Sequence, residues 1–147
     1  MSAATCAHHA PEIREMKSIQ PYLNFDGTAR EAMTFYHACL GGQLHIQSFG
    51  DVKMPGDQDR TMHSTLTNGS AIIMASDTMP GMSLNKGNNQ YICVDCSDVA
   101  EEERIFAALS EGGQVAQPLQ DTFWGARFGM LTDKFGMHWM FNCDLPK

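Results

Sequence analysis

Two cysteines in the sequence have the spacing of a redox or zinc site. Cys93 and Cys96 form a Cys-x-x-Cys pair, which can act jointly when both thiols converge at a turn or a helix N-terminus. The pair instead falls within Asn89–Cys96, a stretch with the composition of a β-strand. Residues i and i+3 of a strand point to opposite faces of the sheet. The sequence therefore predicts two separate thiols.

The other cysteines also favour free thiols. The chain has five cysteines, an odd number, and Cys39, Cys93 and Cys143 lie in apolar segments. Unpaired thiols in apolar surroundings are typical of proteins in a reducing compartment. We therefore expect a cytoplasmic protein without disulfides.

The N-terminal stretch MSAATCAHHAPEIRE has a different composition from the rest of the chain. It is small and polar and lacks the apolar centre of a secretory signal. We expect residues 1–16 to form a disordered extension, with Met16 as an alternative start of the protein. His8 and His9 beside Cys6 can bind stray metal, but the expected role of this segment is that of an unstructured tail.

Composition and missing motifs exclude several classes of function. The net charge is −7 with no basic cluster, which argues against nucleic acids and anionic membranes as partners. No apolar run approaches the roughly 18 residues of a transmembrane helix. The chain has no Gly-x-Ser-x-Gly, phosphate-binding or dinucleotide-binding motif. With 147 residues, 43% of them apolar, it suits one globular domain.

The elements that must position any site form two similar halves. In the first half the patterns predict a helix over Ala29–Leu40 and strands over Ser18–Phe25, Gln43–Phe49, Thr61–Leu66 and Ala71–Ser76. In the second half they predict a helix from Ser97 or Asp98 to about Glu111 and strands over Asn89–Cys96, Gln114–Pro118, Ala126–Thr132 and Met137–Asn142. Thr28 is the expected N-cap of the first helix.

A repeated motif relates the two halves. FYHACLGG at 35–42 recurs as FAALSEGG at 106–113, an offset of 71 residues. Repeats of this length indicate two copies of one supersecondary unit. We predict an α+β domain over 17–147, built from two βαβββ modules at about 17–80 and 88–147. Helices would cover the outer faces of two mixed sheets, and the inner faces would line a shared cleft.

Several motifs resemble a known superfamily. They are Pro21–Phe25, Phe35-Tyr36 with Leu40-Gly41-Gly42, Met74–Asp77, Thr122-Phe123-Trp124 leading to Phe128-Gly129, and Thr132–Gly136 with Trp139. Together with the module order they resemble the vicinal oxygen chelate superfamily, also called glyoxalase/bleomycin-resistance/dioxygenase, and its PhnB-like branch. Members of this branch are often labelled 3-demethylubiquinone methyltransferases. The chain has no glycine-rich strand-to-helix loop for S-adenosylmethionine, so the sequence does not support that activity.

The resemblance implies positions for a divalent metal on the inner sheet faces. Relatives use His or Gln on the first strand, Glu on the fourth, His on the fifth and Glu on the eighth. Those positions fall here on Gln20, Met74, Gln90 and Met140. Two amides and two thioethers are a poor set for a hard or borderline dication. The sequence therefore favours a protein with no metal and no other cofactor, and a rearranged His138, His63 and Asp77 cluster is the alternative.

Strand alternation from these positions predicts which residues face the cleft. The inward set is Gln20, Tyr22, Asn24, Ile72, Met74, Ser76, Gln90, Ile92, Val94, His138, Met140 and Asn142. The residues between them, such as Leu23, Phe25, Ile73, Ala75, Trp139 and Phe141, would face the helices. The inward set mixes polar groups with thioethers, as small-molecule pockets do, although methionines that simply fill the cleft would give the same pattern.

We therefore expect a small-molecule binding protein without the usual metal. Its predicted cleft residues are Gln20, Tyr22, Met74, Ser76, Asp77, Gln90, Trp124, His138 and Met140. The alternative is a lyase, isomerase or dioxygenase-type enzyme for a small oxygen-rich compound. It would use the rearranged metal site, or His138 and Tyr22 as acid-base residues.

The loop of Phe123 and Trp124 is predicted to act as a lid over the cleft or to lie in a dimer interface. The resemblance implies a homodimer whose modules pair within one chain or across two. A dimer with a filled cleft that acts through protein contacts is a third alternative.

Overall fold

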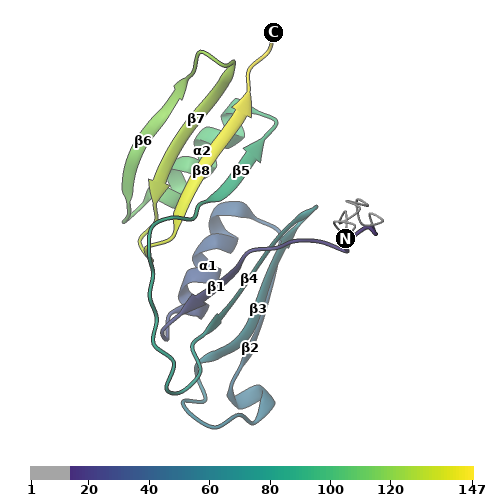
Figure 1. The fold of residues 1–147 in the computed structure, drawn as a ribbon, viewed down its shortest axis with the longest axis vertical. Helices are drawn as coiled ribbons and strands as arrows, with labels where there is room; N and C mark the ends of the chain where they lie inside the picture. The colour runs from purple at the N-terminus through teal and green to yellow at the C-terminus, as the bar shows by residue number, and fades with distance from the viewer. Residues whose placement is uncertain (1–13) are drawn as a thin grey trace, which may run out of the picture.

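The computed structural model describes residues 14–147 as two modules placed end to end (Figure 1). Residues 1–13, with Cys6, His8 and His9, lie outside the described residues. The first module contains β1 (Tyr22–Phe25), α1 (Ala29–Leu40), β2 (Gln43–Ser48), the 3-10 turn η1 (Gly50–Val52), β3 (Thr61–Asn68) and β4 (Ala71–Asp77). The second contains β5 (Ile92–Cys96), α2 (Val99–Ser110), β6 (Gln114–Asp121), β7 (Ala126–Thr132) and β8 (His138–Asp144).

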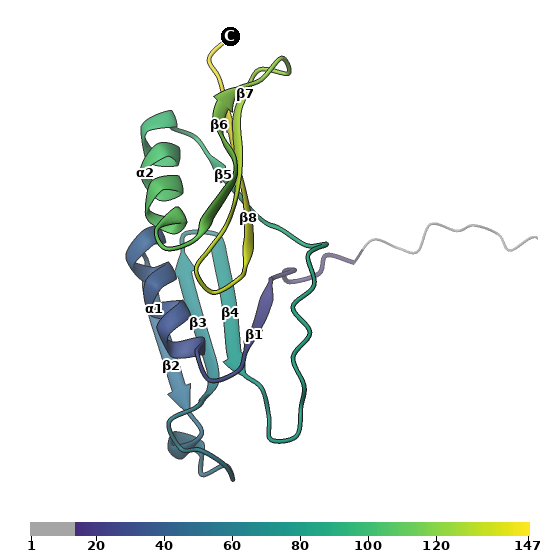
Figure 2. The same cartoon turned by 90° about the vertical axis from the view of Figure 1, so that its left-hand side faces the viewer.

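The two modules repeat one sheet topology. The strand orders are β1-β4-β3-β2 and β5-β8-β7-β6. In each sheet the first strand pairs parallel with the last, and the other neighbours are antiparallel. Both helices lie on the same side of the molecule, and the opposite faces of the sheets have no helix over them (Figure 2). The predicted α+β class and the two βαβββ units are confirmed. None of the described helices is long and apolar enough to cross a membrane.

The two helices begin in different ways. Asp98 caps α2 as predicted, because its carboxylate accepts a hydrogen bond from the Ala100 amide. The Thr28 side chain makes no such bond at the start of α1. The carboxylate of Asp77, from β4, accepts hydrogen bonds from the amides of Gly27 and Ala29 instead. Thr28 therefore holds the predicted N-cap position, but a distant strand supplies the acceptor in place of its side chain.

The second glycine of each Gly-Gly pair lets two strands approach closely. A Cβ at Gly42 would lie 2.1 Å from the carbonyl oxygen of Thr67, and one at Gly113 would lie 2.3 Å from that of Thr132. The repeated motif thus marks equivalent contacts, where the chain leaves the helix and joins the sheet at its far edge. The predicted role of these glycines in ending the helices accounts for only the first glycine of each pair.

A polar contact in the core joins the two modules. The Tyr36 ring of α1 packs edge-on against Trp139 of β8, with centroids 5.2 Å apart. Both side chains donate hydrogen bonds to the Asp133 carboxylate in the β7–β8 turn, from the Tyr36 hydroxyl at 2.6 Å and from the Trp139 indole at 2.8 Å. All three residues are buried. The turn that the sequence predicts at Asp133–Gly136 is therefore also an anchor between modules.

The alternation predicted for β1, β4 and β8 is confirmed. Phe25, Ile73, Ala75, Trp139 and Phe141 are buried against the helices. The alternation predicted for the fifth strand is wrong. Ile92 and Val94 pack on the core rather than facing the open side, since Val94 lies opposite the buried Phe141.

Candidate functional site

A cavity of about 530 Å³ lies where the two modules and their linker meet. Its walls come from β1, the end of the linker between β4 and β5, and the start of β8. Polar lining residues are Tyr22, Asn24, Asn85, Lys86, Asn88, Asn89, Gln90, Tyr91 and His138, and apolar ones are Pro21, Leu23, Leu84, Ile92 and Met137. Three of the predicted cleft residues, Tyr22, Gln90 and His138, therefore meet at one cavity.

Tyr22 is hydrogen-bonded to a histidine other than the one predicted. Its hydroxyl lies 3.1 Å from Nδ1 of His63, and Nε2 of His63 lies 3.0 Å from the Thr65 hydroxyl. These three groups form a chain of hydrogen bonds across the open face of the first sheet. Because both ring nitrogens of His63 have partners, the imidazole is held in one orientation.

His138 is held by the second module. Its Nδ1 lies 2.9 Å from the Thr132 hydroxyl, and its ring packs against Tyr91 with centroids 5.6 Å apart. Among the described residues Nε2 of His138 has no hydrogen-bond partner. His138 and Tyr22 thus line the same cavity without a direct bond between them, and the predicted Tyr22–His138 acid-base pair is not formed as a bonded pair.

Asp77 has a structural role, and its place among the predicted cleft residues is wrong. Its side chain is buried and accepts backbone hydrogen bonds from Gly27, Ala29 and Thr61. It therefore joins the ends of β1, α1 and β3 at the far end of the first module. The rearranged metal cluster of Asp77, His63 and His138 is not formed, because each of these side chains is bonded in a different neighbourhood.

The remaining predicted site residues lie outside this cavity. Met74 and Ser76 lie on the open face of the first sheet, and Met140 lies on that of the second. Gln20 precedes β1 and donates a 2.7 Å hydrogen bond to Ser18.

Trp124 lies at the β6–β7 tip beside Phe123, with ring centroids 5.0 Å apart. It also packs edge-on against Phe128, with centroids 5.9 Å apart. Neither cavity described for this chain includes Trp124. A lid formed by this loop is therefore not seen within one chain.

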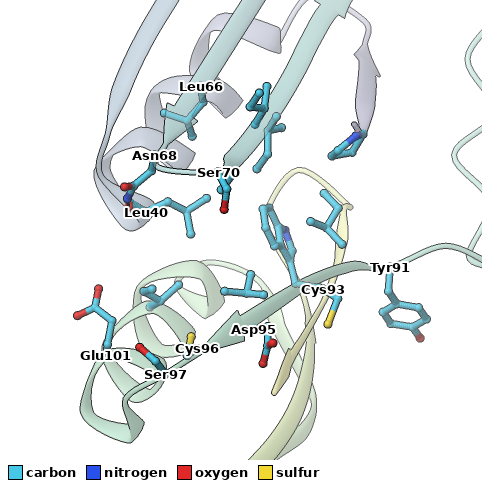
Figure 3. A pocket seen from close by; sticks show the side chains of 18 residues that line it. Leu40, Leu66, Asn68, Ser70, Tyr91, Cys93, Asp95, Cys96, Ser97 and Glu101 are labelled. Carbon is cyan, nitrogen blue, oxygen red and sulfur yellow. Dashed lines mark hydrogen bonds between the residues drawn. The ribbon is translucent and has the colours of Figure 1, made fainter. Parts of the chain in front are cut away.

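A second cavity, of about 720 Å³, separates the turn end of the β3–β4 hairpin from β5 and α2 (Figure 3). Its floor is apolar and its rim carries Asn68, Ser70, Asp95 and Glu101. Cys93 and Cys96 line it but point to different sides of β5, one exposed and one half-buried, as the spacing predicts.

Neither thiol of this pair is activated. Burial, with a smaller contribution from the charge of Glu102, raises the pKa of the Cys96 thiol to about 11. Burial also raises the pKa of Cys93, with a smaller contribution from Asp95. Both thiols are therefore protonated at neutral pH and are weak nucleophiles.

The residues of one chain do not fit the divalent metal that the superfamily implies. Within residues 14–147 no three His, Cys, Asp or Glu side chains lie close enough together to hold an ion. The positions assigned by the resemblance, Gln20, Met74, Gln90 and Met140, supply neither an imidazole nor a carboxylate. No step involving a metal can be derived from this donor set.

Sequence patterns missed the contribution of the linker. The stretch from Asp77 to Asn88 interrupts the strand pattern, and the predicted module bounds leave residues 81–87 in neither module. Its final part supplies Asn85, Lys86 and Asn88 to the cavity. The run of amides from Asn85 to Gln90 was the available signal, since such a run in a strand-poor segment suits a polar lining.

Two βαβββ modules with their helices on one side define the class. This is the fold of the glyoxalase/bleomycin resistance/dioxygenase proteins, whose solved structures the chain resembles. The chain belongs to the PhnB-like family, described as 3-demethylubiquinone-9 3-methyltransferase, which matches residues 17–141.

Individual relatives agree with this assignment. The crystal structure of protein PA1353 from Pseudomonas aeruginosa is 45% identical, covers 89% of this chain and 100% of its own, and has a TM-score of 0.83. A putative 3-demethylubiquinone-9 3-methyltransferase, PhnB protein, from Bacillus cereus is 26% identical, covers 86% and 99%, and has a TM-score of 0.69. Protein YjdN from Escherichia coli (strain K12) is 31% identical over 84% of this chain and 93% of its own length.

Proposed function

We propose that the protein binds a small molecule in the cavity between β1, the linker and β8, without a metal ion. The observation that supports this most directly is the meeting of Tyr22, Gln90 and His138 at one cavity of about 530 Å³. That volume lies in the usual range of ligand pockets, roughly 300–1,000 Å³. The mixture of apolar walls and directed polar groups also suits a ligand held by shape and a few hydrogen bonds.

Native mass spectrometry of the purified protein tests this function. We expect a retained small molecule, or one acquired from a fragment mixture, at one per chain and without a stoichiometric metal. The His138→Ala variant should lose that ligand, whereas His37→Ala, which lies on α1 away from the cavity, should keep it. A stoichiometric divalent metal that is lost on His138→Ala would contradict the proposal.

A second candidate function is metal-free acid-base catalysis, and it is favoured by the chain from Tyr22 through His63 to Thr65. A phenol bonded to an imidazole can exchange a proton with a bound carbonyl compound. This candidate, a lyase or isomerase, predicts that Tyr22→Phe and His63→Gln abolish turnover but leave binding largely intact. Equal turnover by the wild type and the His63→Gln variant would contradict this candidate function.

We further propose that the protein is a homodimer in which a second copy covers the open sheet faces. The open face of the first sheet is largely polar, with His45, His63 and Thr65 beside Met74, and that of the second is mixed, with Phe128, Met130 and Met140 beside Thr132, His138 and Asn142. Phe123 and Trp124 at the β6–β7 tip are 97% and 55% exposed. Exposed neighbouring aromatics are typical of interfaces.

The dimer predicts that Phe123→Ser with Trp124→Ser gives a folded monomer by light scattering. A wild-type protein that is monomeric at tens of micromolar would contradict it.

The described cysteines, Cys39, Cys93, Cys96 and Cys143, are all free thiols, which supports the cytoplasm as the setting of this function.

A further inference from the structure

The charges around the cavity differ from those of the whole chain. The protein has 17 acidic and 10 basic residues, yet none of the 15 residues that line the cavity is acidic. The one fully charged side chain among them is Lys86. The lining of this cavity therefore contains a cation and no carboxylate, although the protein as a whole is acidic.

Lys86 has little else to bind. Within residues 14–147 it takes part in no ion pair, and its ammonium group makes one long hydrogen bond, 3.5 Å, to the carbonyl oxygen of Phe135. This contact holds the linker against the β7–β8 turn and leaves donor capacity on the ammonium group. The acid of that turn, Asp133, is buried and already accepts four hydrogen bonds. It is not a free counter-ion for Lys86.

The other polar groups in the lining can also donate hydrogen bonds. Five amide side chains surround Lys86 in the lining: Asn24, Asn85, Asn88, Asn89 and Gln90. Four of them, all in the linker, make no side-chain hydrogen bond to any described residue, and Asn24 uses its oxygen to accept a bond from Ser76. His138 has Nδ1 bonded to Thr132, so Nε2 is the nitrogen left for a ligand. Amide, imidazole and ammonium donors around an apolar floor form a site for negative charge.

We propose that the ligand carries an oxyanion, either a carboxylate or a phosphate, bound by Lys86, with amides of the linker and His138 donating further hydrogen bonds. The apolar part of the ligand lies on Pro21 and Leu84. This inference rests on the small-molecule function proposed above and narrows the class of ligand. The proposal excludes a neutral ligand of the same size, because such a ligand would not gain the charge attraction of the Lys86 ammonium group.

Titrations followed by amide nitrogen–proton NMR test the charge requirement. The probes are benzoate, its neutral isostere benzamide, and inorganic phosphate, each added to the full-length protein at constant ionic strength. We expect benzoate or phosphate to shift the signals of Gly136, Gln90 and the linker amides saturably, and benzamide to bind at least about fivefold more weakly. Which of the two anions binds more tightly distinguishes a carboxylate ligand from a phosphate ligand.

Two lysine variants separate a local contact from the effect of overall charge. Lys86→Gln should weaken binding of the anion about fivefold, while Lys147→Gln, which removes the same charge at the C-terminus, should not change it. Benzamide that binds as tightly as benzoate, or an unchanged affinity in a folded Lys86→Gln variant, would contradict the proposed oxyanion. Neither result would contradict the binding of a small molecule in this cavity. If no probe and no neutral fragment shifts any cavity signal, the proposed binding function fails as well.

Discussion

The hydroxyl of Tyr36 in the first module donates a 2.6 Å hydrogen bond to the carboxylate of Asp133 in the second. The two residues are 97 positions apart and both are buried. Burial raises the pKa of Tyr36 above its usual value, and the charge of Asp133 raises it further. The phenol is therefore a permanent donor, and the bond joins α1 to the β7–β8 turn that borders the candidate cavity.

Removal of that hydroxyl should destabilise the fold. In Tyr36→Phe, Asp133 loses one of its four donors in a buried position. We expect the free energy of unfolding in urea to fall by about 1.5–3 kcal/mol, the range for hydrogen bonds to charged groups. Tyr22→Phe, which alters a phenol that is 45% exposed, is the control and should change stability little. Equal losses in both variants would contradict the anchor role of Tyr36.

The close approach at Gly113 predicts a steric effect of a single methyl group. In Gly113→Ala the new Cβ would lie 2.3 Å from the backbone oxygen of Thr132, so the strands must separate. We expect a loss of about 3 kcal/mol in urea unfolding. Gly125→Ala is a suitable control, because its φ is +84° but nothing lies within 4 Å of the added methyl group. Gly125→Ala should lower the free energy of unfolding by about 1 kcal/mol. A larger loss in Gly125→Ala than in Gly113→Ala would show that the close approach at Gly113 is not rigid.

Glu102 predicts an unusual dependence of stability on pH. Its side chain is 0% exposed and neither carboxylate oxygen has a partner among the described residues. Burial raises its pKa above the ordinary value, although Arg127 partly opposes this. The folded state therefore holds the proton on Glu102 more tightly than the unfolded state does. The stability that this proton contributes to the fold is lost as pH rises from about 4.5 through the folded pKa.

Replacement by a neutral side chain should remove this cost. We expect Glu102→Gln to raise the melting temperature by roughly 2–4 °C at pH 7, and the difference should shrink below about pH 4.5, where the carboxyl group is protonated in both states. Calorimetry across that range is the measurement. Glu103→Gln, on the exposed side of α2, controls for net charge, although it also removes an ion pair with Arg127. A lower melting temperature for Glu102→Gln at pH 7 would show that the buried carboxylate is stabilising.

The structural role of Asp77 predicts a separation of stability from binding. Asp77→Ala leaves the amide of Gly27 and the buried amides of Ala29 and Thr61 without their acceptor. We expect a loss of about 3 kcal/mol or more in the free energy of unfolding. Ligand affinity of the fraction that remains folded should be unchanged, because Asp77 is not part of the cavity lining. Weaker ligand binding by a fully folded Asp77→Ala variant would show that Asp77 belongs to the binding site.

Sequence periodicity predicted most of the fold, because a strand or helix shows its buried face in the spacing of apolar residues. The bounds of α1 agree at both ends, and the alternation in β1, β4 and β8 is confirmed. In β5 the prediction failed by one residue. Its alternation was counted from Gln90, which lies in the linker, whereas the parallel register with β8 determines that Val94 faces the core.

The candidate site was predicted less completely. Tyr22, Gln90 and His138 do meet at one cavity. Strand alternation places Tyr22 and His138 on the open side, whereas Gln90 comes from the linker before β5. The partner of Tyr22 is 41 residues away in β3, and no local pattern indicates which side chain it meets. The same reason explains why Asp77 was placed in the cleft when it caps α1.

The sequence by itself determined the two-module fold, the free thiols and the poor metal donor set, because these depend on residue types and on short-range spacing. The tertiary structure decided that Lys86 and the linker amides line the cavity, that Tyr22 bonds to His63, and that Asp133 joins the modules. Those relationships depend on how the linker folds back and how the modules pack against each other. Such contacts follow from the summed burial of many side chains, which the residues near each position do not encode.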